Sequence, residues 1–338
     1  DVASLSVKFD ILGLRTLSVV YDVCKQIGID SSQINPHDPS IYTALASLRS
    51  PQGLFQIEAE TNFKVCQLIA PQNLEQLSAV VAIARPGALE FKDNYRDYVR
   101  TGEFQSVHEF FDDILSYTGG IPLYQEQLMK MAVKVGFSLD ESEQLRRIVG
   151  KKKVDQMPAW KAKIEEKVKE NNLDGAVGEV LWKVAEDSAN YSFNKSHSIS
   201  YAYLAAITVY LKFNHPQEFF LSLLKYTKFE PNSHEEIARI SQELSHFDIK
   251  LLPPDLNKSD IDFKIEGKDI RYGLNSIKGV SDKVLQALLE FREDSFDNKY
   301  EVFLSAKQAG LNIGTLSALI QAGLLDSFVS SNRCRLVL

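Results

Sequence analysis

The sequence predicts a mainly helical α+β protein, and three observations support this fold class. Apolar residues recur at helical spacing through most of the chain, from about Leu54 to Lys225. Strand patterns occupy only residues 7–12 and a short pair of stretches around 263–272. Prolines at positions 231, 253 and 254 then mark a connecting region before small helices that extend from 281 to 328.

The composition is that of a globular protein, because 44% of the 338 residues are hydrophobic and 25% are charged. The most apolar stretch, 201–211, is too short to span a bilayer, so no membrane segment is expected. The three cysteines and six histidines lack the spacing of a disulfide framework or a zinc site, which points to the reducing cytoplasm. A net charge of −7 does not exclude nucleic acids, since the position of positive charge matters more than its sum.

The predicted strand at 7–12 places two charged residues on one face. Val7, Phe9 and Ile11 alternate with Lys8 and Asp10, so these last two project from the same side. Two-metal phosphoryl transfer needs several carboxylates around ions roughly 3.5–4 Å apart. Most single aspartates on strands are simply solvated, and Asp10 would supply one metal ligand and no more.

The next elements are a helix and a region of turns. Apolar residues at helical spacing predict a helix over about 17–27. The stretch 28–51 is rich in Pro, Ser and Asp and is expected to form turns around one short helix.

A helix over 139–149 has the clearest start signal of the chain. Ser138 and Glu141 have the spacing of a capping box, and Gly150 is expected to end the helix in the left-handed conformation.

Positive charge is concentrated between residues 146 and 169, which contain nine Lys and Arg residues but only three Asp and Glu residues. Arg146 and Arg147 occupy the last turn of the predicted helix, and Lys151, Lys152 and Lys153 follow it. Arginine offers a planar fork to phosphate oxygens and lysine a mobile point charge, so the cluster suits a triphosphate. From charge alone, the alternative of a solvated helix end that complements the helix dipole is slightly favoured.

Polar donors, a cation and aromatic rings lie together in residues 191–201 (YSFNKSHSISY). A helix that is apolar nearly all round follows at 201–213 and ends before Pro216. Free N–H groups at a helix start attract phosphate, and aromatic rings can stack on a base. An ordered loop with Ser198 as the helix cap, and with a purely structural His197, is an equally open interpretation.

The segment 277–283 (IKGVSDK) has the pattern of a tight glycine turn that opens a helix. Such a turn presents backbone N–H groups to a DNA phosphate without reading sequence, although the pattern also fits any helical hairpin. The expected DNA contacts are Lys278, Gly279, Val280, Ser281 and Lys283. A second glycine segment at 310–314 is a candidate for a related turn.

Eight short motifs follow one another along the chain. They are KFDILGLRTL at 8–17, GLFQIE at 53–58, ARPGAL at 84–89, LYQEQLM at 123–129, LRRIVGKKK at 145–153, FNKSHSISYA at 193–202, LLPPDLNKS at 251–259 and IRYGLNSIKGVSDK at 270–283. In this order the chain strongly resembles the alpha subunit of bacterial DNA polymerase III, the C family of DNA polymerases, in its non-PolC branch. Two departures are Ala88 in place of a proline and Ser281 in place of a glycine.

The resemblance implies roles for particular residues. Asp10 matches the third metal-binding aspartate of the palm, and Lys8 matches a lysine beside the active site. The implied nucleotide site consists of Arg146, Arg147, Lys151, Lys152, Tyr191, Asn194, Lys195 and His197. In that site the two arginines hold the triphosphate, Tyr191 lines the nucleotide pocket and His197 crowds the sugar 2′ position.

The implied domains are the end of the palm sheet at 1–30, helical fingers at 31–228, a linker at 229–260 and a helix-hairpin-helix region at 261–338. The implied activity is DNA-directed DNA synthesis with two Mg²⁺ ions, of which this chain supplies one ligand. The chain alone is therefore expected to be inactive. The implied partners are primer-template DNA and dNTP and, for the complete protein, the sliding clamp, the clamp loader and the proofreading exonuclease.

Two alternatives of other classes stay open. One is a non-catalytic DNA-binding module that uses only the helix-hairpin-helix region. The other is a helical scaffold with a phosphate-neutralising patch. Nucleotide binding separates the enzyme from both.

Overall fold

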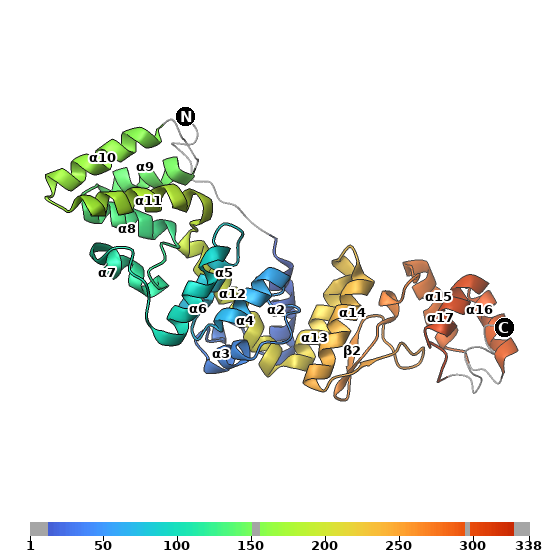
Figure 1. Ribbon diagram of the computed structural model, residues 1–338. Coiled ribbons are helices and arrows are strands. Elements are labelled where there is room, and N and C mark those ends of the chain that lie inside the picture. Colours follow the sequence, from blue (N-terminus) through green and yellow to red (C-terminus); the bar gives the residue numbers. More distant parts are fainter. Residues whose placement is uncertain (1–12, 151–155, 295–297, 328–338) are drawn as a thin grey trace. The chain divides into compact units, whose positions relative to one another are not determined.

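The computed structural model describes residues 13–150, 156–294 and 298–327 (Figure 1). The described chain is mainly helical with one small sheet, which confirms the predicted fold class. The strand predicted at 7–12 lies outside the described residues. Contacts divide the chain into two units, one made of residues 34–213 and the other of the segments before and after it.

The unit at 34–213 is built from α-helices. Turns and single 3₁₀ turns connect them. Its α-helices are α3 (Pro39–Ala46), α4 (Glu60–Ile69), α5 (Leu74–Ile83), α6 (Lys92–Thr101), α7 (Asp112–Leu115), α8 (Gln125–Val135), α9 (Leu139–Gly150), α10 (Met157–Glu170), α11 (Gly175–Tyr191) and α12 (Lys195–Asn214). The dominance of helix over 54–225 and the single short helix within 28–51 are thus confirmed.

Two hydrophobic cores hold this unit together. The first joins α3 to α6 with α12 and contains Leu45, Tyr95 and Val209, none of them exposed. The second joins α7 to α11 and includes Leu145 of α9 and Leu181 of α11. Figure 1 shows α8, α9, α10 and α11 as a bundle of neighbouring helices. Burial of apolar side chains in these cores is the main source of stability for the helices that contribute to them.

The predicted capping box of α9 is confirmed, but the left-handed conformation predicted for Gly150 is wrong. The backbone N–H of Ser138 donates to Glu141 Oε2 at 2.8 Å, and the N–H of Glu141 donates to Ser138 Oγ at 3.2 Å. Gly150 is the last residue of α9 and does not have a positive φ. Glycine tolerates right-handed helical dihedrals as well as left-handed ones, so a glycine at a helix end need not be left-handed.

The buried helix predicted at 201–213 is confirmed as part of α12, which begins earlier, at Lys195. Asn194 caps it, because its Oδ1 accepts a hydrogen bond from the backbone N–H of His197 at 2.8 Å. Ser198 is therefore not the cap. It lies inside the helix, fully buried, and its Oγ donates to the carbonyl of Ser78 at 2.7 Å.

The other unit contains α2 and a series of short helices and strands that follow α12 in the chain. They are α2 (Arg15–Ile27), α13 (Pro216–Tyr226), α14 (Ser233–Leu244), β1 (Leu251–Leu252), β2 (Lys264–Glu266), β3 (Asp269–Arg271), α15 (Asp282–Arg292), α16 (Lys299–Gln308) and α17 (Ile313–Gln321). The helix predicted at about 17–27 is confirmed as α2, which packs on α13. Gly28 ends α2 with a φ of 76°.

The sheet of this unit has the strand order β1-β3-β2. The strand pair predicted around 263–272 is confirmed as β2 and β3, which are antiparallel with Ile265 opposite Ile270. The parallel strand β1 pairs Leu251 with Ile270 and was not predicted. Two residues are too few to show an alternating pattern.

Among the described residues, no helix combines the length and the apolar character that crossing a membrane requires.

Candidate functional site

The Glu143 carboxylate binds both predicted triphosphate arginines on α9. Arg146 donates through Nε and Nη2 to its two oxygens, each at 2.6 Å, and Arg147 donates through Nε to one of them at 2.8 Å. The hydrogen bond from Arg146 is the main reason that the pKa of Glu143 falls to about 2. The same hydrogen bond raises the pKa of Arg146. The two guanidinium groups therefore share one carboxylate.

Arg146 also reaches the first turn of α8. Its Nη1 donates to Oε1 of Gln125 at 3.2 Å. The next residue, Glu126, accepts hydrogen bonds from Nδ2 of Asn194 at 2.9 Å and from the backbone N–H of Lys195 at 3.0 Å. Two consecutive residues of α8 thus connect α9 to the start of α12.

Backbone hydrogen bonds fix the same junction. The N–H of Gln125 donates to the carbonyl of Phe193 at 2.9 Å, and the N–H of Phe193 donates to the carbonyl of Leu123 at 3.2 Å. Tyr124 and Phe193 form an isolated parallel bridge. The segment 191–197 therefore lies directly against the start of α8.

Lys195 is held by groups of its own unit. Its Nζ lies 2.9 Å from Oε1 of Glu75 and 4.4 Å from the centroid of the Tyr117 ring. Within the described residues, Oε1 of Glu75 has no hydrogen-bond partner of good geometry. Its interaction with Lys195 is therefore an ion pair without a hydrogen bond. Burial, together with the charge of Glu75, raises the pKa of Tyr117 to about 12. The positive charge of Lys195 thus offsets the Glu75 carboxylate, which lies near the neutral Tyr117 ring.

His197 and Tyr191 differ in their access to solvent. His197 is exposed on the first turn of α12, with its ring 4.0 Å from the Tyr201 ring. Tyr191 is 6% exposed and packs edge-on against Phe91 with ring centroids 4.9 Å apart. Burial raises the pKa of Tyr191. The Tyr191 ring is therefore part of the hydrophobic core, whereas the His197 ring is exposed to solvent.

Arg85 also belongs to this junction, and sequence reasoning did not select it. Its guanidinium lies 4.0 Å above the Phe193 ring, and its Nη2 donates to the carbonyl of Tyr191. Burial lowers the pKa of Arg85. Gln125, Glu126 and Glu143 were missed as well. Only Glu143 had a local signal, since it stands three and four residues before the two arginines.

The described residues of the basic run at 146–169 are divided between two helices. Lys161, Lys163, Lys167 and Lys169 belong to α10, whereas the two arginines belong to α9. Lys163 lies 4.5 Å from the Trp160 ring, and Lys167 pairs with Glu170 at 3.0 Å. The predicted site residues Lys8, Asp10, Lys151 and Lys152 lie outside the described residues.

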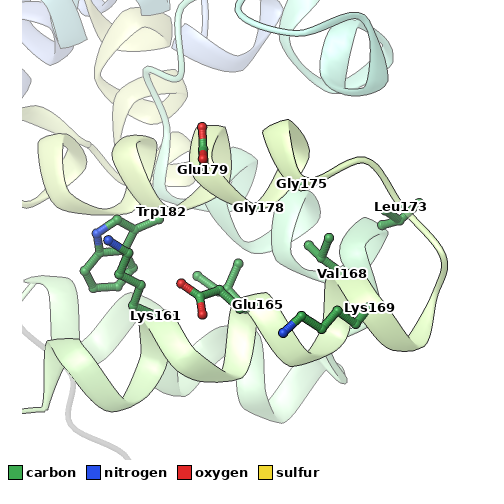
Figure 2. Close-up of a pocket in the computed structure, with 10 residues that line it drawn as sticks. Lys161, Glu165, Val168, Lys169, Leu173, Gly175, Gly178, Glu179 and Trp182 are labelled. Atoms are coloured by element: carbon green, nitrogen blue, oxygen red, sulfur yellow. The ribbon is translucent and has the colours of Figure 1, made fainter.

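A cleft of about 340 Å³ lies between α10 and α11 (Figure 2). Trp182 and Lys161 line one end of it, and Leu173 and Lys169 line the other. A Cβ on Gly178 would lie 3.0 Å from Val168, so the two helices approach closely beneath the cleft. None of the residues assigned to the nucleotide site lines it.

In the other unit, the predicted glycine turn at 277–283 is present. Gly279 has a φ of +85° and nothing lies within 4 Å of the position its Cβ would take. The N–H of Val280 donates to the carbonyl of Ile277 at 3.1 Å, and Ser281 Oγ caps α15 by accepting from the N–H of Val284. Lys278 and Lys283 are exposed on either side of the turn. The element before this turn is a single 3₁₀ turn, Leu274–Ser276.

The segment at 310–314 repeats this geometry. Gly310 has a φ of +82°, and Asn312 caps α17 by accepting from the N–H of Thr315 at 2.7 Å. Here an α-helix, α16, precedes the turn. Both turns place a capping side chain two residues after a left-handed glycine, so both present the start of a helix beside exposed backbone.

Two segments of the chain match known protein families. Residues 14–172 match the finger domain of the bacterial DNA polymerase III alpha subunit, and residues 248–336 match a helix-hairpin-helix motif.

The relatives identify the family. The chain is similar to DNA polymerase III subunit alpha of Thermus aquaticus (33% identity over 98% of this chain), Campylobacter jejuni (35% over 95%) and Aquifex aeolicus (32% over 94%). It therefore belongs to the family of bacterial DNA polymerase III alpha subunits. The chain spans about 28% of the length of each of these three relatives.

Proposed function

We propose that the complete protein containing this chain is a DNA-directed DNA polymerase that transfers nucleotides from dNTP to a primer 3′-hydroxyl. In this proposal the unit at 34–213 holds the triphosphate, and the Gly279 turn holds primer-template DNA. The main structural support is the first turn of α8, which brings Arg146 together with the start of α12.

The triphosphate site is proposed to use two kinds of positive charge. Arg146 and Arg147 supply guanidinium forks, which match paired phosphate oxygens. The start of α12 supplies the positive end of a helix dipole. Lys195 is engaged by Glu75, so we propose that it positions the start of α12 and adds charge at short range.

The aromatic residues are proposed to shape the pocket. Tyr191 would support it from behind, because its ring is buried against Phe91. His197 would face the sugar, because it is exposed beside Asn194 at the helix start.

Mg²⁺ is proposed as the cofactor of the complete protein, since DNA polymerases of this kind generally use it. Within residues 13–150, 156–294 and 298–327, no three His, Cys, Asp or Glu side chains form a group that would hold a metal. Asp10, the proposed ligand, and Lys8 beside it lie outside those ranges.

The domain division stays a proposal: palm end 1–30, fingers 31–228, linker 229–260 and helix-hairpin-helix region 261–338. The sliding clamp, the clamp loader and the proofreading exonuclease are proposed partners of the complete protein, which we expect in the cytoplasm. The family membership supports these proposals.

The test is steady-state incorporation of one nucleotide on a primed template by the complete polymerase. Arg146→Ala should cost about 2–4 kcal/mol of transition-state stabilisation, the scale for removing one preorganised donor, and Arg147→Ala should be comparable. Lys167→Ala should have little effect, because Lys167 pairs with Glu170 on α10. Equal losses for Arg146→Ala and Lys167→Ala would contradict the assignment.

The non-catalytic alternative has its own support in the two glycine turns. A module that used only those turns would bind duplex DNA, and dNTP would neither bind nor alter that affinity.

A further inference from the structure

The Arg146 guanidinium uses its two edges for different partners. The edge formed by Nε and Nη2 takes both oxygens of the Glu143 carboxylate, whereas Nη1 is oriented by the neutral amide of Gln125. The first of these is the edge that pairs with carboxylate and phosphate alike. Loss of Glu143 would therefore leave Arg146 oriented by Gln125, with its binding edge open.

Solvent access allows such an exchange. The side chains of Glu143 and Arg146 are 30% and 29% exposed, and that of Arg147 is 66% exposed. A displaced Glu143 carboxylate can therefore be rehydrated, and no buried charge is left without a partner.

A second bidentate pair in the chain shows the contrast. Arg271 binds both oxygens of Glu266 and also the carbonyl of Pro253, but its side chain is only 8% exposed. The Glu266 carboxylate is 35% exposed, so the contrast lies in the arginine. The Arg271 guanidinium is largely withdrawn from solvent, whereas that of Arg146 is accessible to a ligand.

We propose that Glu143 is an internal stand-in for the triphosphate: its carboxylate fills the arginine forks of the empty site, and the phosphate oxygens of an incoming nucleotide displace it. Glu143 therefore sets the apparent affinity for nucleotide by competing for Arg146 and Arg147. This inference rests on the proposed function, because it takes the two arginines as triphosphate ligands.

The experiment measures single-nucleotide incorporation by the complete polymerase carrying Glu143→Gln. The KM for dNTP should fall roughly 2- to 5-fold, the range for an ion pair with partial exposure, and the effect should shrink as salt is added. The inhibition constant of inorganic tripolyphosphate should fall by the same factor, because the competition concerns phosphates and not the base. Glu143→Ala should lower both constants as well.

Glu170→Gln is the matched control, since it removes a carboxylate that pairs at the same spacing with Lys167 on α10. Its KM should equal that of the unaltered protein. A KM that rises in Glu143→Gln would show that the carboxylate positions the arginines, and an unchanged KM would show that it does not compete. Either result overturns the inference.

Two further readouts separate this inference from the proposed function. If Arg146→Ala raises the KM while Glu143→Gln does not lower it, only the competition is wrong. If Arg146→Ala leaves the KM unchanged, the triphosphate assignment itself fails. A gain in primer-template affinity at constant KM in Glu143→Gln would mean that the arginines bind DNA phosphates, which also overturns the inference.

Discussion

Glu126 and Asn194 are 68 residues apart in the chain and are joined by a hydrogen bond of 2.9 Å. The same carboxylate accepts from the backbone N–H of Lys195 at 3.0 Å. Glu126 thus holds the start of α12 on α8, next to the residue that orients Arg146. Together with the backbone hydrogen bonds of Gln125 and Phe193, this side chain joins the two halves of the proposed triphosphate site.

Replacing Glu126 by Ala should lower the free energy of unfolding by about 1–3 kcal/mol, the scale for hydrogen bonds to a charged group. The KM for dNTP should rise in the complete polymerase, because the start of α12 loses its connection to α8. Glu126→Gln keeps one acceptor oxygen and should recover part of both losses. Glu186→Ala, an exposed glutamate on α11, is the control. Equal KM values for the two alanine variants would refute the connection.

Replacing Arg146 by Lys should recover only part of the activity that Arg146→Ala loses. A lysine keeps the charge but has no planar fork, so bidentate contact with phosphate is lost. The KM for dNTP should rise, and the dissociation constant for primer-template DNA should stay unchanged. Arg96→Lys is the matched control, because Arg96 pairs with Asp93 at the same spacing on α6. Full activity of Arg146→Lys would mean that a point charge is enough.

Replacing Gly279 by Val should weaken duplex DNA binding, because a β-branched residue does not tolerate a φ of +85°. Binding by the unaltered protein should be independent of sequence and should fall steeply with salt as counterions are released. Gly310→Val should have a similar effect through the second turn. Gly267→Val introduces comparable strain in the β2–β3 turn, where φ is +64°, and should leave DNA affinity intact. Equal losses in all three variants would point to general destabilisation.

The stabilisation contributed by Glu143 should depend on pH. Its folded-state pKa is depressed from 4.5 to about 2, mainly by the hydrogen bond from Arg146. A depressed carboxylate pKa stabilises the fold above the unfolded value and loses that contribution as pH falls from 4.5 toward 2. At pH 7, Glu143→Gln should cost up to about 1 kcal/mol of unfolding free energy, given its partial exposure. Urea denaturation should show that this cost shrinks by pH 3, and a cost that is constant with pH would contradict the pairing.

Signals within one turn of chain were readable from the sequence. The Ser138–Glu141 capping box and the glycine turn at Gly279 each depend on residues a few positions apart, and both are present. Gly150 misled for a local reason, since a glycine at the end of a helix can keep right-handed dihedrals as well as adopt left-handed ones.

Contacts between distant segments were not readable. Ser198 and Asn194 are both good helix caps, and the hydrogen bonds that they donate to Ser78 and Glu126 determine which of them serves. Tyr191 carried no sign that its ring would be buried against Phe91, which is 100 positions earlier. The Lys195 charge gave no hint of Glu75 as its partner, because nothing in the spacing relates α5 to α12.

The consecutive positions of Gln125 and Glu126 have a consequence for motion. Separation of α9 from α8 breaks the Arg146–Gln125 bond, whereas separation of α12 from α8 must break both bonds to Glu126 and the backbone bonds of Phe193. The amide hydrogen of Lys195, shielded by Glu126, becomes the natural reporter of that event. Its exchange with deuterium should be slow while the junction is closed. In Glu126→Ala the exchange should be faster, by a factor set by the free energy of the lost hydrogen bonds.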